Sequence, residues 1–168
     1  METFKFLKPK KMLHPTTGMT LEYLDKQSAI AALIISPDEK KGYFVKQFRP
    51  GLKKEVLEVV AGLIDEGEEE LHAMYREIRE ESGFDKDDYE IIYQTKEALA
   101  ISPGYTSERL GCYIVKLKEG ATQKELRLDD GEELVGDFYD LDKVLEISCD
   151  FKTHFLIRLF ELYKLKEK

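Results

Sequence analysis

Apolar and polar residues alternate or cluster along this chain in the short runs that are typical of β-strands. The clearest run is Ser28–Ile35, which is followed by the turn residues Pro37–Lys40 and by a second apolar run, so we expect a β-hairpin there. Residues 1–18 contain Pro9, Pro15 and Gly18 and are predicted to be an irregular arm. The predicted strands are Thr20–Leu24, Ser28–Ile35, Gly42–Phe48, Glu55–Val60, Tyr89–Leu99, Leu110–Leu117 and Gly136–Tyr139.

Helical spacing of apolar residues predicts a helix over Glu69–Ser82 and two more near the C-terminus, over Asp140–Glu146 and Phe151–Leu165. Gly83 is placed to end the first helix in a left-handed turn. Strands mixed with helices predict an α/β or α+β sandwich. The expected packed faces are Leu71, Met74, Tyr75, Ile78 and Ser82 in the first helix and Phe151, Phe155, Leu159 and Leu162 in the last.

The composition narrows the class of protein. A chain of 168 residues without a linker or repeat is expected to form a single domain over 1–168. Its net charge of −8 argues against a nucleic-acid partner or an anionic membrane, since such binders present a basic stripe. The longest apolar run, Ala29–Ile35, is far short of the roughly 20 residues of a membrane helix. Cys112 and Cys149 form no metal or redox spacing and are expected to be buried thiols, so we expect a cytoplasmic protein.

Three glutamates in the first predicted helix are the first candidates for chemistry. Glu77, Glu80 and Glu81 stand at i, i+3 and i+4, so a helix gathers them on one side, where like charges repel one another. A hard cation such as Mg²⁺, which prefers carboxylate and other oxygen ligands, would relieve that repulsion. By spacing alone, however, a solvated charged helix face is the more common explanation.

The longer segment that contains these glutamates favours the metal site over the solvated helix face. Gly62–Phe84 reads GLIDEGEEELHAMYREIREESGF, and it resembles the Nudix box at every fixed position. The resemblance implies a Nudix hydrolase with a mixed β-sheet between helices, and a box that forms a loop, a helix and a loop. It also implies that the chain uses Mg²⁺, with Mn²⁺ as a possible substitute. The matching positions are Gly62, Glu68, Arg76, Glu77, Ile78, Glu80, Glu81, Gly83 and Phe84.

The resemblance also suggests roles for the residues of the box. Glu77, Glu80 and Glu81 become metal ligands or their close supports, together with the main-chain carbonyl near Ala61 or Gly62. Glu68 and Arg76 would brace the loop against the helix, and Gly62 and Gly83 would serve the backbone geometry.

Three further segments resemble the ADP-ribose pyrophosphatase branch of the family. The first is Ser102–Arg109, SPGYTSER, although a plain Pro-Gly turn would look similar. The second is Gln47–Pro50, where Arg49 would contact substrate phosphate through its guanidinium fork. The third is Leu57–Gly62, which has Val60 where many relatives have proline. The substrate-binding candidates are Arg49, Glu58, Pro103, Gly104, Tyr105, Ser107 and Glu108.

The implied reaction is Mg²⁺-dependent hydrolysis of a nucleoside diphosphate sugar, with ADP-ribose giving AMP and ribose 5-phosphate. The alternatives are GDP-mannose or another nucleotide sugar, and a non-catalytic Nudix-fold module, against which the intact acidic cluster argues. The resemblance also implies a homodimer in which the N-terminal segment, residues 1–25, contributes to the partner's site.

The group that activates water is expected on the acidic loop before the last strand, at Asp129–Glu133. Carboxylates that hold a metal are poor proton acceptors, and in the resembled branch the base lies on such a loop. Glu132 is the first candidate, followed by Glu133 and Asp130, and the box residue Glu80 is a further one. A solvated acidic turn is the competing interpretation of the loop.

Overall fold

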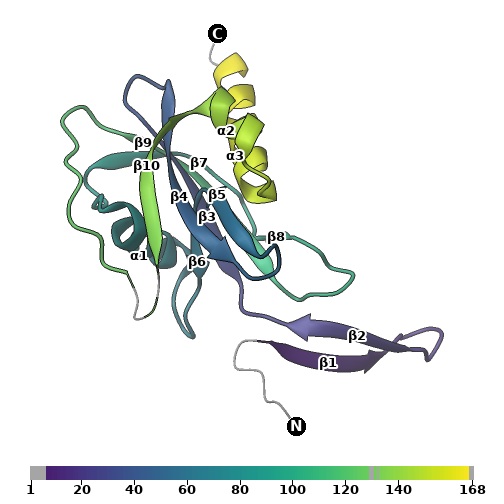
Figure 1. Cartoon of the computed structure of the whole chain (residues 1–168). Coiled ribbons are helices and arrows are strands. Elements are labelled where there is room, and N and C mark those ends of the chain that lie inside the picture. Colours follow the sequence, from purple (N-terminus) through teal and green to yellow (C-terminus); the bar gives the residue numbers. More distant parts are fainter. Residues whose placement is uncertain (1–6, 129–130, 132, 167–168) are drawn as a thin grey trace.

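The computed structural model describes residues 7–128, 131 and 133–166 as a sheet flanked by helices, with a separate hairpin near the N-terminus (Figure 1). The expectation for Thr20–Leu24 and the three helices is confirmed to within two residues at each end. The strands are β1 Lys8–Leu13, β2 Thr20–Asp25, β3 Ala29–Ile35, β4 Lys41–Arg49, β5 Lys54–Glu58, β6 Val60–Leu63, β7 Tyr89–Gln94, β8 Leu99–Ala100, β9 Arg109–Leu117 and β10 Leu134–Asp140. The helices are α1 Glu70–Ser82, α2 Leu141–Ile147 and α3 Phe151–Lys166.

The main sheet is mixed, as the family resemblance implied. Its central path runs β10-β4-β3-β9-β7, and β5, β6 and β8 pair with β4, β3 and β9. β3 and β9 are parallel, while the other pairs are antiparallel. The hairpin predicted around Pro37–Lys40 is confirmed by the antiparallel pairing of β3 with β4.

β3 lies at the centre of the molecule because both of its faces are buried. Ile30, Ala32 and Ile34 pack in one cluster with Met74 and Ile78 of α1, whereas Ala29, Ala31 and Leu33 pack in another cluster with residues of α2 and α3. A continuous apolar run is the pattern expected of a strand covered on both faces. The sheet therefore lies between α1 on one side and α2 with α3 on the other, which confirms the predicted sandwich.

The prediction of an irregular N-terminal arm was wrong for Lys8–Leu13. This segment is β1, which pairs along its whole length with β2 in a separate two-stranded sheet. Every residue of β1 is exposed, so its sequence lacks the alternation that burial imposes on a strand. The hairpin projects away from the sandwich in Figure 1.

Two predicted strands are each divided in the structure. Glu55–Val60 is not one strand, because β5 pairs with β4 as far as Glu58 and β6 starts at Val60 and pairs with β3. Tyr89–Leu99 likewise ends at Gln94, and Leu99–Ala100 forms the short strand β8 beside β9. At the first break the apolar pattern continues, because Val59 stays buried while the chain changes its partner from β4 to β3. At the second break β7 and β8 both pair with β9, residues 94–97 are polar, and β8 is exposed.

The predicted packed faces of α1 and α3 were partly wrong. In α1 Leu71 is exposed, while Ala73, Glu77 and Glu81 join Met74, Ile78 and Ser82 among the buried residues. In α3 the buried residues are Thr153, Leu156, Ile157 and Phe160, and Phe151 and Leu162 are exposed. Cys112 is buried as expected, whereas Cys149 is exposed. No helix among the described residues is long and apolar enough to cross a membrane.

Candidate functional site

Two glutamates of α1 reach the same short stretch of backbone at the start of the box. Glu81 Oε2 accepts a hydrogen bond from the Ala61 amide at 3.2 Å. The Glu77 carboxylate lies against Gly62, where an added Cβ would be only 1.9 Å from Glu77 Oε1. Both side chains are nearly buried, with 8% exposure for Glu77 and 3% for Glu81. Position 62 therefore has to be glycine for Glu77 to lie where it does.

Arg76 connects the loop of the box to the helix. Its guanidinium donates to both carboxylate oxygens of Glu68, at 3.0 and 2.9 Å, and to the Leu63 carbonyl at 2.9 Å. Its Nη1 donates to Glu77 at 2.6 Å and to Glu80 at 3.1 Å. The hydrogen bond to Glu68 raises the pKa of Arg76 and lowers that of Glu68, so both remain charged. Arg76 and Glu68 thus join the loop of the box to α1 by hydrogen bonds.

Gly83 ends α1 in the left-handed conformation that the sequence predicted, with φ of 78°. An added Cβ there would lie 2.1 Å from the Lys124 carbonyl oxygen, so the following loop packs closely on this glycine.

The donor set at Ala61–Gly62 suits a hard divalent cation. It offers the Glu77 and Glu81 carboxylates against the backbone of Ala61 and Gly62, and Mg²⁺ prefers carboxylate and other oxygen ligands. Among the described residues, no group of three or more histidine, cysteine, aspartate or glutamate side chains is arranged so that it could hold a metal ion. Arg76 supplies the positive charge next to Glu77 and Glu80 here. Binding of a cation would therefore require these contacts to rearrange.

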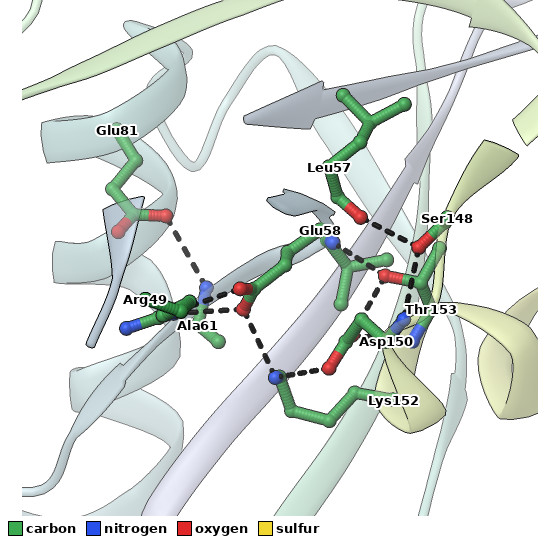
Figure 2. Close-up of polar contacts among 10 residues, drawn as sticks. Arg49, Leu57, Glu58, Ala61, Glu81, Ser148, Asp150, Lys152 and Thr153 are labelled. Atoms are coloured by element: carbon green, nitrogen blue, oxygen red, sulfur yellow. Dashed lines mark hydrogen bonds and ion pairs between the residues drawn. The ribbon is translucent and has the colours of Figure 1, made fainter. Parts of the chain in front are cut away.

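Arg49 and Glu58 form a bidentate ion pair beside the box (Figure 2). Arg49 Nε and Nη2 donate to the two carboxylate oxygens of Glu58, both at 2.7 Å. Glu58 is 2% exposed, and the hydrogen bond that Arg49 donates to it, followed by its negative charge, raises the pKa of Arg49. Lys152 of α3 donates to Glu58 at 3.1 Å and to Asp150 at 2.7 Å. Glu58 is thus shared by two cations from different parts of the chain.

The start of α3 is hydrogen-bonded to the strand that leads into the box. Ser148 Oγ donates to the Leu57 carbonyl at 2.6 Å, and the Val59 amide donates to Thr153 Oγ1 at 2.9 Å. Asp150 Oδ2 accepts from the Thr153 amide and hydroxyl, at 2.9 and 2.8 Å, and so caps the helix. Figure 2 shows these contacts on the side of Glu58 that faces away from Glu81. Each of the residues 57, 58 and 59 is therefore held by the α3 segment.

A cavity of about 730 Å³ opens beside these groups, and we call it the main cavity. Of the residues predicted from the sequence, Arg49, Ala61, Gly62 and Glu108 line it. Pro103, Gly104, Tyr105 and Ser107 are not among its lining residues, and Glu58 lies behind Arg49. The lining also includes Asp150, Phe151 and Lys152, which no motif in the sequence indicated.

The Ser102–Arg109 loop is attached to the end of β2. The Leu24 amide donates to the Tyr105 carbonyl at 2.7 Å, and the Ser107 amide donates to the Leu24 carbonyl at 3.0 Å. Lys26 Nζ pairs with Glu108 at 2.7 Å. The segment turns tightly at Pro103–Gly104, since the Tyr105 and Thr106 amides both donate to the Ser102 carbonyl. Tyr105 itself is 58% exposed.

The acidic loop begins next to α1. The Arg127 amide donates to the Glu80 carbonyl at 3.0 Å, and Arg79 Nη1 donates to the Glu125 carbonyl at 2.8 Å. The candidate bases Glu132 and Asp130, with Asp129, lie outside the described residues. Glu133 is exposed and immediately precedes β10.

Comparisons with known proteins agree with this geometry. The NUDIX domain model matches residues 25–158. The chain is 32% identical over 145 residues to an ADP-ribose pyrophosphatase of Bacillus subtilis, covering 86% of this chain and 70% of that protein. It is 31% identical over 131 residues to a methanol dehydrogenase activator of Bacillus methanolicus, covering 77% of this chain and 62% of that protein. It is also 31% identical over 109 residues to an uncharacterized Nudix hydrolase of Schizosaccharomyces pombe, covering 62% of this chain and 51% of that protein.

Proposed function

Since the chain belongs to the Nudix family of hydrolases, we propose that it cleaves the diphosphate linkage of a nucleoside diphosphate sugar with the help of Mg²⁺. ADP-ribose is the proposed substrate, and AMP and ribose 5-phosphate are the products. The observation that carries this proposal is the approach of Glu77 and Glu81 to Ala61–Gly62, on the wall of a cavity that Arg49 also lines. The similarity to the Bacillus subtilis ADP-ribose pyrophosphatase supports the choice of substrate.

Glu77, Glu80, Glu81 and the Ala61 carbonyl would hold the metal. A bound Mg²⁺ would neutralise phosphate charge and lower the pKa of a bound water. The buried positions of Glu77 and Glu81 fix their carboxylates beside the box backbone, so little side-chain freedom would be lost on binding. Arg76, which contacts both Glu77 and Glu80, would have to give up part of these contacts when the metal binds.

Arg49 would bind the diphosphate. Its Nε and Nη2 are oriented by Glu58, and Nη1 takes part in neither of these two bonds. A guanidinium that is already fixed on one edge loses little conformational entropy when its remaining donors meet phosphate oxygens. Glu108, which also lines the main cavity, would contact the sugar portion, and its partner Lys26 would hold it in place.

The acidic loop would supply the base that accepts a proton from water. Arg127, whose amide is bonded to the Glu80 carbonyl, holds the start of this loop against α1. Glu132 is the proposed base, and Glu133 and Asp130 follow it. We further propose that two chains form a homodimer through their N-terminal hairpins.

A substrate panel tests the function. Steady-state kcat/KM is measured with Mg²⁺ for ADP-ribose, GDP-mannose, other nucleotide sugars and nucleoside triphosphates, with identification of the products. We expect ADP-ribose to be the best substrate, with AMP among the products. A preference of tenfold or more for GDP-mannose, which is about 1.4 kcal/mol in transition-state binding, would instead identify that sugar nucleotide as the substrate. Absence of turnover across the panel would favour a binding module.

A further inference from the structure

Lys152 has no role in the proposed reaction, yet it is built into the wall of the main cavity. Its side chain is 20% exposed and contacts two carboxylates, Glu58 at 3.1 Å and Asp150 at 2.7 Å. Burial alone would lower the pKa of Lys152, but Asp150 and Glu58 outweigh burial and raise it, so the ammonium group stays charged at neutral pH. Burying a lysine is costly unless it is paired, and here both of its partners are fixed.

Glu58 links Lys152 to Arg49. Its Oε2 accepts hydrogen bonds from both Arg49 Nη2 and Lys152 Nζ, at 2.7 and 3.1 Å. Arg49, Lys152 and Glu58 together carry a net charge of +1, whereas Arg49 and Glu58 alone would be neutral. Asp150 brings the formal charge of the four groups to zero, but its carboxylate contacts Lys152 and caps α3 at Thr153. Without Lys152 the three remaining groups would carry a net charge of −1. The electrostatic potential at the Arg49 side of the cavity therefore depends on Lys152.

We propose that Lys152 is a positioning residue for diphosphate binding, and that it acts through Glu58 on Arg49. By sharing the Glu58 carboxylate, Lys152 leaves Arg49 oriented but less neutralised, so that the guanidinium attracts the diphosphate. This inference rests on the proposed role of Arg49. It adds α3 to the substrate site, from a position 94 residues after Glu58 in the chain.

The alternative is that Lys152 contacts phosphate directly, since it lines the same cavity. The two possibilities differ in what happens when Arg49 is absent. A lysine that acts through Glu58 loses its effect together with Arg49, whereas a direct contact keeps its effect. A double-mutant cycle measures this difference, because residues that act through one another give non-additive changes.

The test is the affinity for inorganic diphosphate, measured by titration calorimetry at constant Mg²⁺ in four proteins. These are the unmodified chain, Lys152→Met, Arg49→Met and the double variant. In Lys152→Met the Glu58 carboxylate is left to Arg49 alone and neutralises it more fully, so binding is expected to weaken by about tenfold. In the Arg49→Met background we expect the same replacement to change the affinity by less than about twofold, since the route through Arg49 is gone. An equal loss in both backgrounds would overturn the positioning role, as would unchanged affinity in Lys152→Met.

Two further variants separate this role from a simple loss of structure. Lys152→Arg keeps the charge and should restore most of the affinity. Lys116→Met is the matched control, because Lys116 shares the Glu39 carboxylate with Lys164 at 2.6 and 3.1 Å but does not line the main cavity. We expect Lys116→Met to leave diphosphate affinity unchanged. If Lys116→Met weakens binding as much as Lys152→Met, the effect is general and the proposal is wrong.

Kinetics with the best substrate of the panel give an independent readout. Lys152→Met should raise KM by about the same factor as it weakens diphosphate binding while kcat changes less than about threefold, because the lost interaction is present in the ground state as well. A fall in kcat at unchanged KM would contradict a role in binding. Since the calorimetric cycle needs no turnover, a chain that hydrolyses nothing in the panel would refute the proposed function without deciding the role of Lys152.

Discussion

Glu81 combines near-complete burial with a carboxylate at the box backbone, so its charge is the feature to remove. Glu81→Gln keeps the size of the side chain, and we expect kcat to fall by at least about a thousandfold, the scale of losing a major electrostatic contribution. The fold should persist, because repulsion among like charges on α1 is reduced. The measurements are kcat at saturating Mg²⁺ and the circular dichroism melting curve. Near-normal turnover in Glu81→Gln would rule out the metal role.

Gly62 allows a second test at the scale of one residue. A Cβ at this position would lie 1.9 Å from Glu77 Oε1, so Gly62→Ala must displace the Glu77 carboxylate. A shift of about 1 Å in a reacting geometry can cost about a hundredfold in rate, and we expect kcat to fall by about that factor. Gly51→Ala is the control, because an added Cβ there has no neighbour within 4 Å. Equal activity of Gly62→Ala and Gly51→Ala would mean that Glu77 is not needed where it lies.

At the scale of elements, burial on both faces made β3 predictable, and fixed spacing made α1 predictable. Prediction from the sequence failed where burial imposes no apolar pattern on the residues. β1 is wholly exposed, and its strand exists because β2 supplies its hydrogen bonds. The face of α3 was misplaced because Phe151 and Leu162 are apolar yet exposed, while the polar Thr153 is buried by its bond to Val59.

The candidate site divides in the same way. The box residues could be named from the sequence, since one helix and its preceding loop hold them at fixed intervals. The segment before the box is also contacted by Ser148, Lys152 and Thr153, which lie 91 to 94 residues further along the chain. Contacts over such a distance cannot be inferred from local residue spacing. These contacts form only because the folded sheet brings the start of α3 beside β5.

The acidic loop is the element on which the proposed base lies. Gly131 has φ of 85°, a left-handed turn that suits glycine, and Arg127 holds the preceding segment to Glu80. We expect Glu132→Gln to lower kcat by about 10²–10⁴-fold, the usual contribution of a general base, with KM within a few-fold of its original value. Glu133→Gln and Asp130→Asn, assayed together with it at saturating Mg²⁺, compare the neighbouring acids. If all three keep more than half of the normal kcat, the base lies elsewhere and Glu80 becomes the next candidate.

At the scale of the whole molecule, the N-terminal hairpin lies outside the sandwich and is not stabilised by its core. β1 and β2 form a sheet of only two strands, which is marginally stable alone in water. Met12, Leu13 and Met19 are 49%, 66% and 62% exposed on it. The hairpin is joined to the body where Leu24 contacts the Ser102–Arg109 loop, and Leu7 and Lys8 reach the main cavity. An apolar surface on such a hairpin is what a second copy of the chain could cover.

The homodimer proposal therefore predicts that one charge on the hairpin separates the subunits. Leu13→Glu introduces a carboxylate at a side chain that is 66% exposed in one chain and would be buried between two. Burying that charge without a partner costs several kcal/mol, so the dimer should dissociate at micromolar concentration. Leu165→Glu is the matched control, since Leu165 is 67% exposed near the end of α3 and the association should survive its replacement. Light scattering after size exclusion gives the masses, with the unmodified chain expected at twice its 19.5 kDa and Leu13→Glu at the single mass. If the hairpin completes the partner's cavity, hydrolysis should fall together with dimerisation. An unmodified chain that is monomeric and fully active would refute the contribution of the hairpin to the partner's site.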